Sequence, residues 1–432
     1  PPDVKDVRIK LTNKTDVPGR FNVTVRHGDR VIATNRTDKD EITFDASGWP
    51  IGRFVVSADL ESNDGRRLLS LHRVIHRRAI EPPRQPTAGA KLAVRDDGVF
   101  TLDGEPFFPY FPGPTPHDSP LAQNCFNVRY GDIALVAHAL DRPKVGLPWV
   151  TREDGKTFVV LPDEKTMYAQ MGRLLKSRRD DPSILCWMIK YEGQIPLYRG
   201  VKPNREKLDN VAEYRRINTF IKKHAPNHLT SIHVDAAHHL LDYQHLADVI
   251  ELAHWRSSYA RQLIPNLTDS LTEVRKLIGP SKPFLFWIGS SIPDPKYRTA
   301  EEIRCAVYLS MIHGASGVIF HMGHGGVALD YTRHWSVYAG LAKEVEVLYP
   351  VIKAKPGNTN VTCDNDAIQI AVRGSHVIMV NTANTQVNAK FDVRGVAALE
   401  AVWEGRTIKR DSAGFSDRFT AFEPHVYKIV SR

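Results

Sequence analysis

The sequence lacks several signatures that define common classes of protein. No apolar run approaches the roughly 20 residues that cross a bilayer, so we expect no membrane-spanning helix. No glycine-rich phosphate loop is present, because the glycines of HGASGVIFHMGHGG bracket a strand-like run instead of opening a helix after one. No G-x-S-x-G elbow occurs either. These absences argue against nucleotide binding and against an ordinary serine hydrolase.

Cysteine is also scarce. The four cysteines are far apart and form no CxxC pair, so the sequence indicates neither a zinc ribbon nor a redox motif. The 58 Lys and Arg outnumber the 49 Asp and Glu, which gives a formal net charge of +9. Because the two signs are mixed and no basic motif carries interleaved aromatics, we expect no nucleic-acid partner. A solvated mixed surface is the simple interpretation of the charge, and an anionic polysaccharide partner is the sharper one. A homo-oligomer stays an open alternative.

Three zones follow one another along the 432 residues. Residues 1–85 alternate apolar and polar positions in short runs separated by turns, which predicts an immunoglobulin-like β-sandwich. The segment EPPRQPTAGA then has the composition of a proline-rich linker. Residues 360–432 contain hairpin-like strands with glycine turns, which predicts a second, C-terminal β-sandwich.

Residues 95–355, between the two sandwiches, alternate eight apolar strand-like runs with amphipathic helical segments. This alternation predicts a (β/α)8 TIM barrel, so the fold class is α/β with flanking sandwiches. The eight runs are PFFPYF, CFNVRY, KVGLPWV, ILCWMIKY, HLTSIHVD, ADVIELAHW, PFLFWIG and GVIFHM.

One of these runs leads to a candidate catalytic carboxylate. DPSILCWMIKYEGQ has the continuous apolar character of a strand buried on both faces, and Glu192 follows that strand. Carboxylate chemistry on sugars usually needs a second carboxylate nearby. Asp235 ends the next run, SIHVD, and parallel strands bring both residues to the same rim. With Glu192 as acid and Asp235 as base, the site would invert configuration if the carboxyls were roughly 6.5–9.5 Å apart.

Other interpretations of the carboxylates stay open. Asp235 is equally expected as a helix N-cap or as a salt-bridge partner at the rim. Asp294, in the loop after the seventh run, is a weaker candidate base. Glu251 lies in the middle of its run and is expected to be too deep in the barrel.

Aromatic, basic and histidine residues near the rim are candidate substrate contacts. Aromatic faces stack on sugar rings, although each could equally pack the barrel. Arg129 could pair with a substrate carboxylate or with Glu192, and rim histidines are expected to hydrogen-bond sugar hydroxyls. The expected substrate-binding residues are Tyr110, Arg129, Trp149, His233, His254, Trp255, Trp287 and His321.

The late histidines raise the alternative of a catalytic metal. His233 and His254 would suit a metal-dependent barrel hydrolase, but such enzymes also need His-x-His on the first strand, and PFFPYFPG has none. His321-x-x-His324 follows a strand and does not lie on a helix, so its spacing is not diagnostic. We therefore expect no metal and no other cofactor.

Four segments resemble one family of glycoside hydrolases. FTLDGEPFFPYFPG resembles the opening of the barrel in the β-galactosidase/β-glucuronidase type, within the retaining barrel clan. DPSILCWMIKYEG, ADVIELAHW and KPFLFWIG resemble the fourth, sixth and seventh strands of that family, in the same order. The resemblance implies a glycosidase acting on an oligo- or polysaccharide, secreted or periplasmic, although PPDVKDV at the start of the chain has no signal-peptide character.

The resemblance assigns roles only in part. It implies that Glu192 is the general acid/base. The family's asparagine before the acid corresponds to Tyr191, and its nucleophilic glutamate corresponds to Trp287, which cannot form a glycosyl ester. Three outcomes remain: Asp235 serves as base, Tyr191 is a phenolic nucleophile with an unidentified base, or the barrel is catalytically inactive and binds glycans.

Overall fold

The structure of the chain is a computed structural model. It describes residues 5–11, 18–27, 30–50, 52–77, 92–112, 149–153, 156–161, 163–180, 184–190, 196–199, 206–253, 263–289, 299–321, 335–354 and 357–430. Within these ranges, no helix is both long enough and apolar enough to cross a bilayer.

The N-terminal strands form two antiparallel sheets. One pairs β1 with β4, and the other has the order β3-β2-β5-β6. Alternate residues of β2 and β5, such as Val23, Val25 and Phe54, are buried in one shared core with Ile42 and Phe44 of β4. This is the two-layer packing that the alternating pattern predicts. The strands are β1 Asp6–Lys10, β2 Gly19–His27, β3 Arg30–Thr37, β4 Glu41–Asp45, β5 Gly52–Ser62 and β6 Arg67–Arg77.

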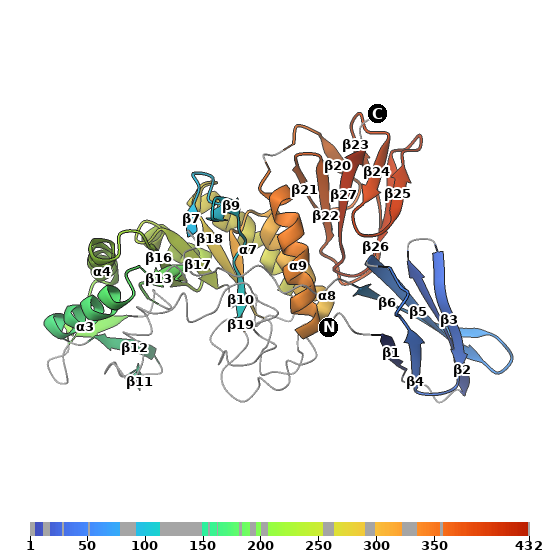
Figure 1. Ribbon diagram of the computed structural model, residues 1–432, viewed down its shortest axis with the longest axis horizontal. Helices are drawn as coiled ribbons and strands as arrows, with labels where there is room; N and C mark the ends of the chain where they lie inside the picture. The colour runs from blue at the N-terminus through green and yellow to red at the C-terminus, as the bar shows by residue number, and fades with distance from the viewer. Residues whose placement is uncertain are drawn as a thin grey trace.

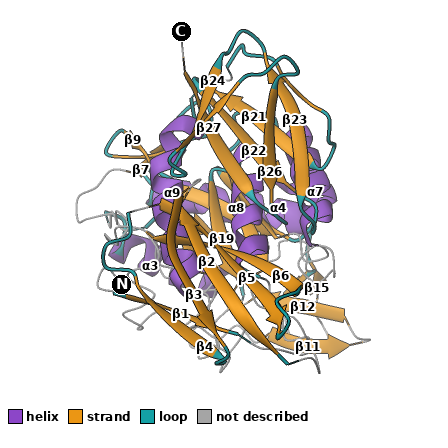
Figure 2. Cartoon of the chain, turned by 90° about the vertical axis from the view of Figure 1, so that its right-hand side faces the viewer, coloured by secondary structure: helices purple, strands orange, loops and turns teal. Residues whose placement is uncertain are grey.

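The C-terminal strands also form two antiparallel sheets around one core, in the orders β20-β23-β26 and β21-β22-β27-β24-β25. Figures 1 and 2 show this sandwich beside the N-terminal one. The strands are β20 Val361–Cys363, β21 Ile368–Arg373, β22 His376–Asn381, β23 Val387–Val393, β24 Ala398–Ala401, β25 Arg406–Lys409, β26 Phe415–Phe419 and β27 Pro424–Val430.

A six-stranded parallel sheet lies between the sandwiches in the sequence and has the order β10-β19-β18-β17-β16-β13. β10, the first of these strands in the sequence, pairs with β19, the last, and a closing barrel requires this pairing. The described residues show these six strands, not a complete barrel. The strands are β10 Tyr110–Pro112, β13 Cys186–Met188, β16 Leu229–Val234, β17 Val249–Ala253, β18 Phe284–Gly289 and β19 Gly317–His321.

Of the predicted second and third barrel strands, the described residues test only the end of the third. CFNVRY lies outside the described residues. The prediction for KVGLPWV is wrong at its described end, because β11 Trp149–Glu153 pairs antiparallel with β12 Lys156–Leu161. An Asp-Gly pair between the two runs is a typical hairpin signal. These strands form a separate sheet with β14 Leu197–Arg199 and β15 Glu206–Lys207.

Helices pack on the outer face of the parallel sheet. Trp187, Ile250 and Phe286 point from the sheet into the same apolar core as the helices. Side chains cap the starts of some of these helices: Asp209 caps α4, and the Thr299–Glu302 capping box begins α8. The helices are α3 Glu164–Ser177, α4 Asn210–His224, α5 Leu240–Tyr243, α7 Leu263–Ile278, α8 Ala300–Ile312 and α9 Trp335–Ile352, with the 3-10 turn η3 Ala237–His239.

The inner face of the sheet is closed at its amino end by a small antiparallel sheet. Its strands are β7 Leu92–Val94, β8 Phe100–Leu102 and β9 Glu105–Pro106. Phe100 and Leu102 share an apolar cluster with Leu285 and Ile319 of the parallel strands. The Ser316 hydroxyl donates to the Gly98 carbonyl (2.8 Å) just before β19 begins. The opposite, carboxyl end is therefore where a site must open.

Helix α8 lies between the parallel sheet and the C-terminal sandwich. Nine of its thirteen residues are buried, since it packs on β18 and β19 on one side and on β22 and β27 on the other. Trp403 lies in the turn after β24, has a φ of +66°, and packs against the apolar core between the parallel sheet and its helices. Gly405 of the same turn lies against His27 of the N-terminal sandwich, with an added Cβ 3.3 Å from Nε2. All three units thus meet at this turn.

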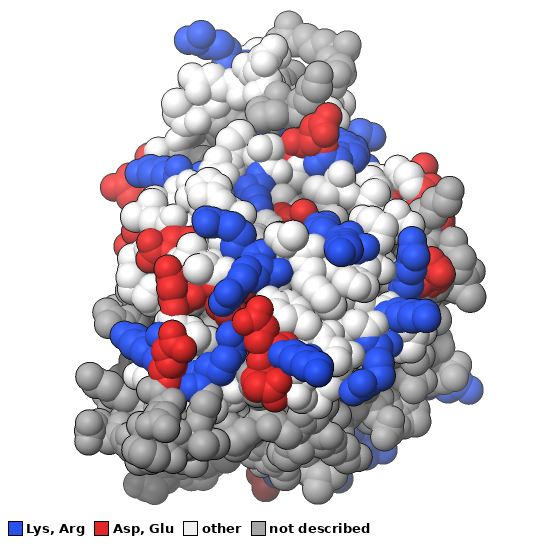
Figure 3. All heavy atoms as spheres, turned by 90° about the vertical axis from the view of Figure 1, so that its left-hand side faces the viewer, with Lys and Arg blue, Asp and Glu red and all other residues white. Residues whose placement is uncertain are grey.

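The outer helices carry a mixed charge. The face of α3 and α4 shows basic and acidic side chains side by side (Figure 3). Arg199, for example, lies between Glu164 of α3 and the buried Glu213 of α4, at 3.3 and 2.8 Å. On this face, acidic and basic side chains are therefore interspersed.

Candidate functional site

The rim, meaning the residues that directly follow the parallel strands, contains Asp235. Asp235 directly follows β16. Its side chain is 32% exposed, and its Oδ1 lies 3.5 Å from Nε2 of His239. The residue before η3 is Ala236, without a side-chain cap, so Asp235 is not a helix N-cap. Burial lowers the pKa of His239, reinforced by His238 and opposed by Asp235 and Asp242. Asp235 therefore faces a histidine that is largely neutral near pH 7.

Directly below the rim lies a group of buried polar side chains on the inner face, Ser231, His233, Glu251 and Trp287, which we name the floor cluster. The Ser231 hydroxyl donates to Oε1 of Glu251 (2.6 Å), and Nε1 of Trp287 donates to Oε2 (3.3 Å). The His233 ring stands edge-to-face on the Trp287 indole, with centroids 5.1 Å apart. Three neighbouring strands, β16, β17 and β18, are thereby joined by side chains.

Glu251 is the titratable centre of the floor cluster and is fully buried. Burial raises the pKa of Glu251 to about 7, although the hydrogen bonds from Ser231 and Trp287 favour the ionised form. The nearby Cys186 thiol also has a raised pKa, first from burial and then from the charge of Glu251. The sheet interior therefore disfavours negative charge.

Two residues expected to contact sugar are packed inside the protein. Tyr110 is fully buried, its hydroxyl donates to the Tyr338 carbonyl (3.0 Å), and its ring packs on Phe320. It belongs to the core between sheet and helices, which corrects its expected place at the rim. Trp287 is 1% exposed, so it is part of the floor and not an open stacking platform.

The other expected residues are placed only in part. His233 is buried, and its backbone N–H donates to the Lys190 carbonyl (3.1 Å). Trp149 is on β11, outside the parallel sheet, and His321 ends β19 beside Gly289; only their backbones are described. The remaining candidates lie outside the described residues: Arg129, Tyr191, Glu192, His254, Trp255, Asp294 and His324.

Sequence reasoning missed Lys190 and Ser231. Lys190 is 2% exposed and lies two residues before Glu192. Ser231, His233 and Asp235 occupy alternate positions of TSIHVD, so a period of two already places them on one face of the strand. That signal was available in the sequence.

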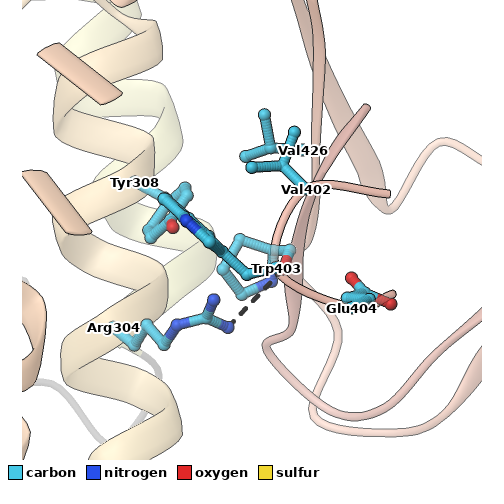
Figure 4. Close-up of a pocket in the computed structure, with 7 residues that line it drawn as sticks. Arg304, Tyr308, Val402, Trp403, Glu404 and Val426 are labelled. Atoms are coloured by element: carbon cyan, nitrogen blue, oxygen red, sulfur yellow. Dashed lines mark hydrogen bonds between the residues drawn. The ribbon is translucent and has the colours of Figure 1, made fainter. Parts of the chain in front are cut away.

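A small hollow lies away from the rim, between α8 and the C-terminal sandwich (Figure 4). Arg304 reaches across it to the Pro424 carbonyl (3.5 Å), and the Arg304 Nε lies 3.1 Å from the buried carboxylate of Glu344. Trp403 and Tyr308 form its aromatic walls. Among the described residues, no group of three or more His, Cys, Asp or Glu side chains is arranged to hold a metal ion.

Comparisons with known proteins give loose structural likenesses. No family model matches the sequence, and no curated protein matches it. An FMN-binding beta-glucuronidase from Facaelibacterium prausnitzii L2-6 is 13% identical, with a TM-score of 0.39 over 98% of this chain and 69% of that one. A beta-glucuronidase from an uncultured Clostridium sp. is 13% identical, with a TM-score of 0.38 over 79% and 66%.

A third solved structure, named only as a glycoside hydrolase, is 13% identical with a TM-score of 0.45 over 81% of this chain and 98% of that one. The chain spans about two thirds of the length of the two beta-glucuronidases. At these values the superpositions are too loose to transfer a site or an activity, so any function has to rest on this chain's own residues.

Proposed function

We propose that the chain is a glycoside hydrolase that cleaves an oligo- or polysaccharide, with Glu192 as general acid and Asp235 as general base. The observation that carries this proposal is the hydrogen bond from the His233 N–H to the Lys190 carbonyl (3.1 Å). The chain segment leading to Glu192 is thereby held beside the strand leading to Asp235. Each carboxylate follows this bond by two residues.

This arrangement supports an inverting reaction. An inverting reaction requires carboxyl groups roughly 6.5–9.5 Å apart, which leaves room for water. Neighbouring strands lie about 4.8 Å apart, so the requirement is that the two side chains diverge from adjacent strand ends. In that reaction, Glu192 gives its proton to the glycosidic oxygen as the bond to the anomeric carbon breaks. Water forms the new bond from the opposite face, and Asp235 accepts its proton.

The described carboxylates favour Asp235 over Glu251 as the base. Asp235 is partly exposed, and its ion-pair contact within the described part of the chain is a long one, 3.5 Å, to His239. Glu251 has no exposed surface, and both of its oxygens accept hydrogen bonds from within the floor cluster. A base must reach the water that it activates, and Glu251 does not.

Trp287 supports an alternative, a barrel that only binds glycans. It occupies the position where the resemblance expects a nucleophile, and its N–H is engaged by Glu251. Retaining chemistry would then need a different nucleophile, for which Tyr191 is the candidate. The inverting and inactive alternatives predict different results in one experiment.

The test is a hydrolysis screen on cello-oligosaccharides, xylan, oligogalacturonates and hyaluronan, with product anomers followed by proton NMR from the first minutes. Glu192→Gln and Asp235→Asn should each lower the rate by about 10²–10⁴-fold. Asp242→Asn is the matched control, because Asp242 is an exposed acid on α5, the short helix that follows Asp235. Inverted product with both losses supports the proposal.

Retained configuration would refute the inverting mechanism and direct attention to Tyr191. Binding of a glycan without any cleavage would refute the enzyme and support the binding protein. Equal effects of Asp235→Asn and Asp242→Asn would remove Asp235 from the base role.

A further inference from the structure

The floor cluster contains a carboxyl group in a place where an apolar residue would be less costly. Around Glu251, the inner face is otherwise filled by apolar side chains such as Val249, Leu285 and Ile319. A buried carboxyl is unfavourable unless its oxygens are hydrogen-bonded. Within the described ranges, Glu251 meets this condition through side chains of the two adjacent strands, which makes the cluster interdependent.

The contacts connect Glu251 with both strands that flank it. Ser231 on β16 and Trp287 on β18 donate to different oxygens of the same carboxyl. The indole held in this way supports the ring of His233, whose backbone N–H bonds to Lys190 at the rim. A continuous set of contacts therefore runs from the carboxyl group to the strand ends.

We propose that Glu251 is a positioning residue of the candidate site, which fixes the Trp287 indole and, through it, His233 as a rigid floor beneath Asp235. Where this concerns carbohydrate, it rests on the proposed function. Glu251 touches no substrate in this role. It acts by holding the residues on which the rim is built.

The ionisation of Glu251 gives this role a measurable signature. Burial raises its pKa to about 7, so a negative charge develops beside the indole as the pH rises through neutrality. The titratable side chains that face it are Cys186 on β13 and His233 on β16, while β18 contributes Trp287 and Leu285, which do not titrate. The indole therefore reports directly on this carboxyl group.

The experiment compares Glu251→Gln, Glu251→Ala and Trp287→Phe in the full chain. Glutamine can still accept from the indole and contact Ser231, so kcat and KM should stay within about threefold of wild type below pH 7. Alanine removes the carboxyl group that accepts from the indole N–H, and Trp287→Phe removes the donor. Both should raise KM by about tenfold or more, with a smaller change in kcat, on whichever oligosaccharide of the screen is cleaved.

Trp187→Phe is the matched control. Trp187 is also a fully buried tryptophan on a strand of this sheet and donates to Nδ1 of His228 (2.8 Å), but it packs on the outer face. Its loss should lower thermal stability about as much as Trp287→Phe and leave KM unchanged. A rise in KM that merely followed stability, equal in both tryptophan variants, would overturn the positioning role.

Tryptophan emission between about pH 5 and pH 9 tests the contact without any substrate. Wild type and Trp187→Phe should show a step near pH 7 that is absent from Glu251→Gln and Trp287→Phe. Persistence of the step in either of these two overturns the inference. If the step behaves as expected but no glycan is cleaved or bound, the proposed function fails while the positioning of Trp287 by Glu251 stands.

Discussion

The floor cluster of the parallel sheet and a charged group in the C-terminal sandwich both bury carboxylates, and they do so in opposite ways. In the floor cluster, one carboxyl is satisfied by a hydroxyl and an indole, which are neutral donors. In the second group, which we name the charge cluster, cations and carboxylates are paired. Its members are Glu404, Arg406, Asp417, Glu423 and His425.

The contacts of the charge cluster are short and mutual. Arg406 donates to Asp417 at 2.6 and 2.9 Å and to Glu404 at 2.7 Å. His425 Nδ1 lies 3.0 Å from Asp417, and its Nε2 lies 3.4 Å from Glu423. Burial would lower the pKa of His425, but the three carboxylates outweigh it and raise the pKa to about 9.

The difference shows which form of a buried carboxyl each region stabilises, the protonated or the ionised one. With neutral donors, a buried carboxyl gains a proton and becomes sensitive to pH near 7, whereas paired ions stay charged across the neutral range. The first arrangement suits a site and the second suits a structural joint. Four predictions would break or sharpen this comparison.

The largest expected effect comes from Arg406→Met. This change removes the guanidinium that donates to Asp417 and Glu404 and leaves His425 to balance three buried carboxylates, so we expect about 3–5 kcal/mol less free energy of unfolding, measured by urea denaturation at pH 7. Arg36→Met removes an exposed pair with Glu61 and should cost only about 0–1 kcal/mol. A loss below that of Arg36→Met would mean that the charge cluster contributes little.

The second prediction concerns Glu251→Gln. The folded-state pKa of Glu251, about 7, lies above its ordinary value of 4.5, so its contribution to stability is complete below pH 4.5 and is lost as the pH rises through 7. Over that range wild type should lose about 3 kcal/mol that the variant keeps. Parallel stability curves for the two proteins from pH 4 to pH 8 would contradict it.

The third prediction, of similar size, concerns His425→Gln. The pKa of His425 is raised from 6.5 to about 9, so the stability it provides is complete below pH 6.5 and disappears as the pH rises through 9. Wild type should exceed the variant by about 3 kcal/mol more at pH 6 than at pH 10. Chemical denaturation at both pH values measures this, and an unchanged difference would disprove it.

The smallest effect is expected for Thr299→Ala. Thr299 accepts from the Glu302 N–H (3.1 Å) at the start of α8, the helix between the two regions, and Glu302 accepts in return from the Thr299 N–H. Loss of this cap should cost about 1 kcal/mol of unfolding free energy. If α8 couples the regions, near-UV and far-UV circular dichroism should show one common transition, shifted equally. Two separated transitions would show that they unfold independently.

The sequence patterns predicted the strands better than their partners. The continuous apolar runs of β16, β17 and β18 and the alternation of β2 and β5 follow directly from which faces are buried. Trp149 belongs to an apolar run of the same kind, yet its strand pairs antiparallel with β12, because periodicity does not encode the partner.

For the candidate site too, the sequence did not predict which side chains meet across neighbouring strands. The alternation of Ser231, His233 and Asp235 along one strand was readable from the sequence. The hydrogen bond of Trp287 to Glu251 joins residues 36 positions apart and depends on the register of β17 against β18. The prediction that Trp287 stacks on a sugar ring was based on its residue type and did not include this register.

Helix α8 bears on how such a chain can be rearranged in evolution. A helix that is buried on nearly every side has no face ready for water, and here one side is covered by the parallel sheet and the other by the C-terminal sandwich. Deleting or exchanging that sandwich would expose Cys305 and Tyr308 to water unless residues of α8 were substituted at the same time. We therefore expect the C-terminal unit to be exchangeable only together with the helix beneath it.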